Sequence, residues 1–205
     1  MVVLRLTTPS NVTLQQWSWI ATSLGGVITG LAALQEWDLS REQNARELRW
    51  KKGKLAMEVI DAMKADPFAN KAMIMLDWTN RDFVLTSGKI ARIRFEDLTG
   101  GLREHIPGKF EFSESESFIR DCFDHFADHL QRIGHLIEIG LIHPEDVRHP
   151  LKYWAQRMAH KDICKTGDPV RQFLKVYEYD LALALVQELV SSPAQTEIDN
   201  AALSA

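Results

Sequence analysis

The stretch that organises the chain reads Trp17-Ser-Trp-Ile-Ala-Thr-Ser-Leu-Gly-Gly-Val-Ile-Thr-Gly-Leu-Ala-Ala-Leu34, and no charged residue occurs from Leu6 through Gln35. As a helix, these 18 residues would extend roughly 27 Å, close to the thickness of the hydrocarbon layer of a bilayer. Trp17 and Trp19 stand at one end and Trp37 at the other, where indole rings favour the headgroup region. The stretch predicts a transmembrane helix over residues 14–37, with these tryptophans as interface anchors in a lipid bilayer.

The composition of this stretch leaves a second interpretation open. Threonine, serine and three glycines dilute its aliphatic residues, and a buried core helix of a soluble bundle can look similar. Glycine costs about 1 kcal/mol against alanine in a water-exposed helix, whereas in a membrane small residues let two helices approach closely. Ser18, Thr22, Gly26 and Gly30 form a row at a spacing of four residues. We expect this row to be a packing face of the membrane helix, through which a homo-oligomer could form.

The charged flanks predict how the helix is oriented. Arg5 is the only Lys or Arg before the stretch, whereas six follow within a short distance. The positive-inside rule therefore places residues 1–13 outside and the remainder in the cytoplasm. Residues 35–37, Gln-Glu-Trp, offer no small-residue cleavage site, so we expect an uncleaved single-pass anchor rather than a signal peptide. The six basic residues are Arg41, Arg46, Arg49, Lys51, Lys52 and Lys54.

The remaining residues are sufficient for one small domain. The chain has 205 residues with a net charge of −4, which does not favour a nucleic-acid partner. Cys122 and Cys164 are too few and too far apart for a zinc or disulfide framework, and they suit a reducing compartment. We expect an amphipathic juxtamembrane helix at residues 38–66, a helical cytoplasmic domain at residues 67–190, and a disordered tail at residues 191–205.

Hydrophobic periodicity predicts a mainly α-helical fold with at most one short strand. Apolar residues in alternating steps of four and three indicate a helix over residues 117–139, for which Gly140 is a suitable cap. Asp66-Pro67 is expected to end the juxtamembrane helix, and Asp168-Pro169 to begin a helix that continues to residue 190. Residues 90–95 could form the strand. Whether the membrane helix continues unbroken into the juxtamembrane helix stays open.

Few residues offer chemistry. Asp121, His125 and His129 lie one turn apart on one helix, a spacing at which two histidines can bind zinc. Both histidines fall at the margin of the apolar face, where a ring usually packs and its tip is wetted, so ordinary packing is the favoured interpretation. Cys122 is expected to be an inert core thiol. No phosphate-binding loop, nucleophile elbow or Cys-x-x-Cys motif occurs, so we predict no catalytic residue, cofactor or metal.

One resemblance adds to these expectations. The segment Ser117-Phe-Ile-Arg-Asp-Cys-Phe-Asp-His-Phe126, the segment Gly140-Leu-Ile-His-Pro-Glu-Asp-Val147, and Tyr153-Trp154 are similar to the core helices of a broad group of uncharacterised bacterial single-pass membrane proteins. These proteins carry a small helical cytoplasmic domain after an N-terminal membrane helix. The resemblance covers about two-thirds of the chain and includes no catalytic motif. It implies architecture and attachment to a bacterial inner membrane, with no stated activity.

Three functions are therefore compatible with the sequence. The first is a membrane-anchored helical interaction or scaffold protein with an unknown protein partner. The second is a soluble helical binding module whose first helix is part of the core. The third is a membrane-bound enzyme whose site, with Asp121, His125 and His129 as its candidates, has no recognisable motif. We expect the first, and the chain is more consistent with a binding protein than with an enzyme.

Overall fold

The computed structural model describes residues 14–78, 80–109, 111–159 and 166–191, and its side chains are described from residue 36 onwards, apart from Asp38. Within these residues it has seven helices and one two-stranded sheet, which confirms the predicted mainly helical class. The chain divides into two compact units, Met1–Trp50 and Lys51–Ala205. The predicted segment 1–13 lies outside the described residues, as does the predicted tail 191–205 apart from Ser191, which is the last residue of a helix.

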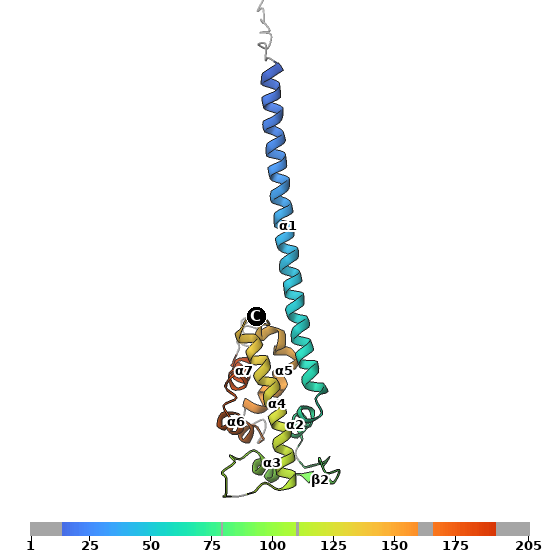
Figure 1. Ribbon diagram of the computed structural model, residues 1–205, viewed down its shortest axis with the longest axis vertical. Coiled ribbons are helices and arrows are strands. Elements are labelled where there is room, and N and C mark those ends of the chain that lie inside the picture. Colours follow the sequence, from blue (N-terminus) through green and yellow to red (C-terminus); the bar gives the residue numbers. More distant parts are fainter. Residues whose placement is uncertain (1–13, 79, 110, 160–165, 192–205) are drawn as a thin grey trace, which may run out of the picture. The chain divides into compact units, whose positions relative to one another are not determined.

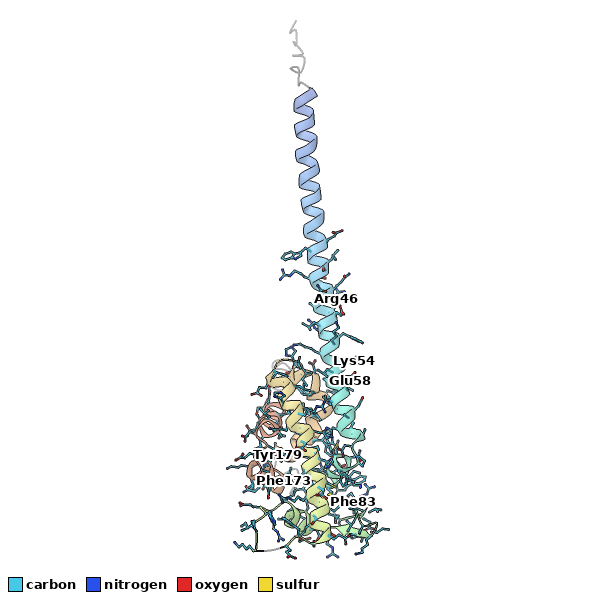
Figure 2. The ribbon with its side chains drawn as sticks, in the orientation of Figure 1. Arg46, Lys54, Glu58, Phe83, Phe173 and Tyr179 are labelled. Carbon is cyan, nitrogen blue, oxygen red and sulfur yellow. The ribbon has the colours of Figure 1, made fainter. Side chains whose placement is uncertain are left out.

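Helix α1, Leu14–Ala65, has no break near residues 38–40, so the helix over residues 14–37 continues into the juxtamembrane helix, a point that the sequence left open. From Glu36 to Trp50 every described side chain is exposed, as Figure 2 shows for Arg46. Trp37 and Leu48 are among these exposed residues. The Arg41 guanidinium stacks on the Trp37 ring at 4.6 Å from its centroid. None of the helices in the described part of the chain combines the length and the apolar character that a bilayer crossing requires.

The corner between α1 and α2, Pro67–Asp77, is formed by Asp66. Its Oδ1 atom accepts hydrogen bonds from the backbone N–H groups of Phe68, at 2.8 Å, and Ala69, at 3.1 Å. Asp66 is therefore the N-cap of α2, with proline at the first helical position. The prediction that the preceding helix ends at Asp66-Pro67 is confirmed.

Strands β1, Arg81–Val84, and β2, Ile90–Ile93, pair antiparallel, with Arg81 opposite Ile93 and Val84 opposite Ile90. The expectation of at most one strand is therefore wrong. The first strand was missed because its apolar pattern is short: only Phe83 is buried, and Val84 faces outward. Gly88, with φ of 85°, allows the turn between the strands. Helix α3, Phe95–Gly101, follows.

Helix α4, Glu114–Glu138, runs through the centre of the bundle, with α2 packed against it and α3 near one end (Figure 1). It begins three residues before the predicted start because Ser113 and Glu116 form a capping box. Its end is confirmed: Gly140 adopts φ of 73°, and the Leu141 N–H donates to the Leu136 carbonyl. Residues 114–116, which precede the predicted start, therefore belong to the first turn of this helix.

Three helices complete the bundle: α5, Pro144–Ala159, α6, Gly167–Val176, and α7, Asp180–Ser191. Pro150 lies inside α5, and the buried positions Val147, Leu151 and Ala155 continue one apolar face across it. The single helix predicted to end at residue 190 is two helices. Glu178, with φ of 58°, reverses the chain between α6 and α7.

Unit Lys51–Ala205 is held together by one apolar core. It receives buried side chains from α1, from the β1–β2 hairpin and from the other helices, among them Ile60 and Phe123. Phe83 and Phe173, labelled in Figure 2, also belong to this core. Where α4 meets α7 the backbones approach closely: a Cβ added to Gly134 would lie 2.8 Å from the Leu181 carbonyl oxygen. Lys52 of α1 donates from Nζ to the Gly140 carbonyl at 2.8 Å, which ties α1 to the end of α4.

Candidate functional site

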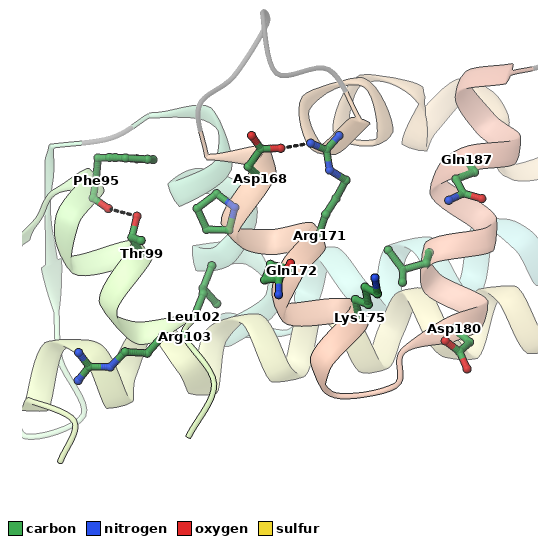
Figure 3. A pocket seen from close by; sticks show the side chains of 12 residues that line it. Phe95, Thr99, Leu102, Arg103, Asp168, Arg171, Gln172, Lys175, Asp180 and Gln187 are labelled. Carbon is green, nitrogen blue, oxygen red and sulfur yellow. Dashed lines mark hydrogen bonds and ion pairs between the residues drawn. The ribbon is translucent and has the colours of Figure 1, made fainter. Parts of the chain in front are cut away.

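An open groove of about 1160 Å³ lies between α3, α6 and α7. Figure 3 shows these three helices contributing side chains to it, with the groove residues of α6 lying between those of α3 and α7. The groove is lined by Phe95, Thr99, Leu102, Arg103, Asp168, Pro169, Arg171, Gln172, Lys175, Asp180, Leu183 and Gln187.

The groove combines an apolar surface with polar groups of several kinds. Phe95, Leu102 and Leu183 supply the apolar area. Arg171 donates to the Asp168 carboxylate and to the Ala159 carbonyl, so this ion pair fixes the start of α6 (Figure 3). Gln172 on α6 and Gln187 on α7 each offer an amide that can donate and accept hydrogen bonds.

The size and the chemistry of the groove favour a large partner over a small substrate. Small-molecule sites are usually about 300–1,000 Å³, enclosed, and lined mainly by apolar groups. This groove is larger, open, and crossed by amide side chains of the kind that can hydrogen-bond a polypeptide backbone. Among the described residues that line it there is no histidine, cysteine or serine. The lining offers apolar contacts and amide hydrogen bonds to a bound molecule.

A second polar site lies at the corner between α1 and α2. The Nδ1 atom of His125 is 2.9 Å, and the Nε2 atom of His129 is 3.3 Å, from the same oxygen, Oδ2 of Asp66. A small groove of about 240 Å³ beside them is also lined by Asp128 and Arg132. The Phe68 ring packs on the imidazole of His125, with 4.9 Å between the ring centroids.

The hydrogen bonds that Asp66 accepts stabilise its ionised form. Partial burial alone would raise the pKa of the Asp66 carboxyl group, but the contacts with His125, with the Ala69 and Phe68 amides and with His129 outweigh burial and hold this pKa well below its ordinary value. Asp66 is therefore an anion at neutral pH. It serves two purposes at once, since one oxygen caps α2 and the other binds α4.

The structure assigns the predicted histidine pair to packing of the bundle. The carboxylate between the histidines belongs to Asp66, whereas Asp121, one turn earlier on α4, is exposed. Within the described residues, no three or more His, Cys, Asp or Glu side chains are grouped so as to hold a metal ion. The sequence interpretation paired the histidines with the nearest carboxylate along the helix. The actual partner is 59 residues from His125 in the chain.

Two other polar groups of α4 are buried without chemistry that we can assign. Burial, together with the neighbouring Asp128 and Asp121, raises the pKa of Asp124, whose carboxylate accepts a hydrogen bond from Tyr179 at 3.5 Å. Burial raises the pKa of the Cys122 thiol to about 12, and this side chain is fully buried. Cys122 is thus protonated at physiological pH, in agreement with an inert core thiol.

The residues assigned to the membrane helix stay predictions. The side chains of Trp17, Trp19, Ser18, Thr22, Gly26 and Gly30 lie outside the described side chains. Trp37 is described and is 57% exposed. The groove residues were missed at the sequence level, because they come from two segments far apart in the chain, residues 95–103 and 168–187, and share no motif. Asp168-Pro169, recognised as a helix start, was the one signal that fell within the groove.

Comparison with known proteins gives no relative. The chain matches no protein-family model, no curated sequence and no solved structure. A function must therefore be argued from the residues themselves.

Proposed function

We propose that the chain is a single-pass, membrane-anchored helical interaction module of a bacterial inner membrane. Residues 14–37 are the anchor, residues 1–13 are extracytoplasmic, and the domain at residues 67–190 lies in the cytoplasm. In this proposal the groove between α3, α6 and α7 docks a segment of a partner protein. The function is a binding or scaffold function rather than catalysis.

One observation carries the anchor: no charge occurs from Leu6 through Gln35, tryptophans stand at both ends, and six basic residues follow the run whereas only Arg5 precedes it. Charged side chains are costly at the centre of a bilayer, so an uncharged run of this length is what an anchor requires. Because the run is rich in glycine and threonine, its apolar character is mild. The anchor therefore rests on the charge pattern rather than on strong hydropathy.

The exposed part of α1 supports the same proposal. Tryptophan and leucine side chains at positions 37, 39, 48 and 50 are each more than half exposed. An isolated helix is only marginally stable in water, because most of the stability of protein helices comes from packing of one face against a partner. A bilayer or a second copy would supply that packing. The row Ser18, Thr22, Gly26 and Gly30 is the surface through which we propose that two copies associate.

Fractionation tests the anchor. Untagged chain, expressed in bacteria, should sediment with membranes at high speed and stay there after an alkaline wash that strips peripheral proteins. A detergent should then release it. Recovery in the detergent-free supernatant would contradict the anchor and would favour the alternative, a soluble helical binding module.

A matched pair of variants tests the groove. Leu183 lines it and is partly exposed, whereas the adjacent Ala184 is exposed and does not line it. Leu183→Arg should remove proteins that copurify with the chain from native membranes, whereas Ala184→Arg should retain them. Both variants should keep the helical circular-dichroism spectrum. Equal recovery of the same proteins with both variants would exclude the groove as the docking surface.

A further inference from the structure

Arg120 of α4 is not among the residues that line the groove, but it contacts two of the elements that do. Residues 95–103 form the α3 wall of the groove, and residues 168–175 form the α6 wall. The Nη1 atom of Arg120 donates to the carbonyl of Arg103, the last residue of the α3 wall, at 3.2 Å. Its Cζ atom lies 4.3 Å from the ring centroid of Tyr177, which ends α6. One side chain therefore joins the two walls.

Three aromatic rings fix the position of the Arg120 guanidinium. Besides Tyr177, its Cζ atom lies 5.1 Å from the ring centroid of Phe112 and 5.6 Å from that of Phe173. A planar guanidinium is attracted to the faces of such rings, and the attraction is stronger where water is excluded. Arg120 is half-buried, and Phe173 is fully buried, with its ring centroid 5.0 Å from that of Tyr177. The core of the bundle thus holds this cation in place.

A second link between the same elements passes through Tyr177. Its hydroxyl group accepts a hydrogen bond from the backbone N–H of His105 at 2.8 Å. The Phe112 ring packs beside this link, 5.4 Å from the imidazole of His105 and 5.2 Å from the Cζ atom of Arg103. Tyr177 therefore receives the chain that leaves α3 on its hydroxyl group and Arg120 on its ring.

The α3 wall needs such links because α3 is short. An isolated helix of seven residues is not stable in water, so tertiary contacts must determine where α3 lies. Leu98 and Leu102 anchor α3 in the core. The contacts of Arg103 and His105 with Arg120 and Tyr177 add a connection to α6. The spacing between the two walls therefore depends on residues that lie outside the groove lining.

We propose that Arg120 is a positioning residue of the groove, which holds the end of the α3 wall against Tyr177 and so sets the spacing between the α3 wall and the α6 wall. The consequence for binding rests on the proposed docking function: a partner segment fits only while this spacing is kept. Arg120 acts through Arg103 and Tyr177 and does not itself touch the partner.

The distance between two spin labels on the purified full chain measures this spacing directly. Cys164 is replaced by serine, and Cys122 is fully buried, so neither takes a label. Cysteines introduced at Thr99 of α3 and Gln172 of α6 carry the labels, since both residues are exposed and line the groove (Figure 3). Pulsed electron paramagnetic resonance then gives the distance distribution between the two walls.

Four variants separate positioning from general stability. Arg120→Met retains an aliphatic side chain and removes the guanidinium. Tyr177→Phe is milder, since it retains the ring beneath Arg120 and removes the acceptor of the His105 N–H. Arg132→Met is the matched control, because Arg132 is an exposed arginine of the same helix. Ile60→Ala destabilises the core of the bundle without changing a residue of the groove or of these links.

Arg120→Met should lengthen and broaden the distance distribution, and Tyr177→Phe should shift it less in the same direction. Arg132→Met and Ile60→Ala should leave it as in the parent chain. An unchanged distribution in both Arg120→Met and Tyr177→Phe would overturn the positioning role, and so would an equal change in Ile60→Ala.

Capture of proteins from native membranes is the second readout. Arg120→Met should lose the same proteins as Leu183→Arg, although Arg120 does not line the groove. If the label distance changes in Arg120→Met while Leu183→Arg and Ala184→Arg recover the same proteins, the positioning role stands and the proposed docking function fails. If Leu183→Arg alone loses the proteins while the label distance in Arg120→Met stays unchanged, docking stands and the positioning role is overturned.

Discussion

Two stretches of helix α1 differ sharply in what stabilises them. Residues 36–50 expose every described side chain, and their internal support is local, such as the 3.3 Å contact of Arg46 with Glu42. Residues 51–65 bury Ala56, Val59, Ile60 and Met63 in the core of the bundle. An exposed ion pair of this spacing contributes only about 0.3–0.5 kcal/mol. The first stretch therefore buries no described side chain, whereas the second is packed into the core.

The largest expected effect contrasts the two stretches directly. Ile60 is fully buried, and Ile60→Ala should lower the free energy of unfolding by about 2–5 kcal/mol, because a cavity replaces core contacts. Leu48 is 57% exposed, and Leu48→Ala should change the free energy of unfolding by less than about 0.5 kcal/mol. Chemical denaturation monitored by circular dichroism measures both. If the two variants lost equal amounts of unfolding free energy, residues 36–50 would have to be packed within the single chain.

The next effect concerns backbone packing within the bundle. Gly134→Val places methyl groups against the Leu181 backbone, where even a Cβ atom would lie 2.8 Å from the carbonyl oxygen. We expect a loss of about 1–3 kcal/mol, measured in the same way. Gly53 of α1 has no atom within 4 Å of an added Cβ, and Gly53→Ala should stabilise the chain by about 0.5–1 kcal/mol. We expect the two glycine substitutions to change the free energy of unfolding in opposite directions, and changes of the same sign would contradict this account.

A smaller effect tests how α1 is joined to α4. Lys52 donates to the Gly140 carbonyl at 2.8 Å and lies 3.1 Å from the Nε2 atom of His143. Lys52→Met should cost about 0.5–1.5 kcal/mol, since an exposed helix end loses its donor. Lys54, 3.7 Å from Glu58 on the same helix, is the matched control, and Lys54→Met should cost no more than about 0.5 kcal/mol. A Lys52 variant indistinguishable from the Lys54 variant would contradict this role.

The smallest effect on folding belongs to the small-residue row. Gly26→Ile should leave the unfolding of the bundle unchanged, because residue 26 lies in the other compact unit. In membranes the same change should remove a crosslinked dimer, since a large side chain separates two closely packed backbones. Insertion into the membrane should stay intact. A dimer that survives the substitution would place the interface elsewhere, and a parent chain without any dimer would end the idea of association through this row.

The sequence predicted the helices where local signals were strong. Asp66-Pro67 and Gly140 were recognised because capping depends on residues adjacent in the chain. The reversal of the chain at Glu178 was not predicted, because a positive φ at a glutamate has no sequence signature and follows from the packing of α6 and α7. The strand at Arg81–Val84 was missed because one buried phenylalanine is too little periodicity.

The candidate sites show the same difference between features set by neighbouring residues and features set by the tertiary fold. The spacing of His125 and His129 placed them on one face of α4, but their carboxylate partner comes from Asp66, a contact that depends on the tertiary fold. The groove joins residues 95–103 to residues 168–187, so none of its chemistry is visible in a local motif. Local capping can be predicted from neighbouring residues, whereas a site assembled from distant helices cannot.

Cysteine labelling in intact cells tests the anchor most directly. With Cys164 replaced by serine and Cys122 buried, one new cysteine is introduced at a time, at Ser10 or at the largely exposed Lys54. An anchor over residues 14–37 predicts that a membrane-impermeant maleimide labels Ser10→Cys in intact cells and Lys54→Cys only after permeabilisation. Labelling of both positions only after permeabilisation would contradict the membrane anchor, and the reverse pattern would invert its orientation.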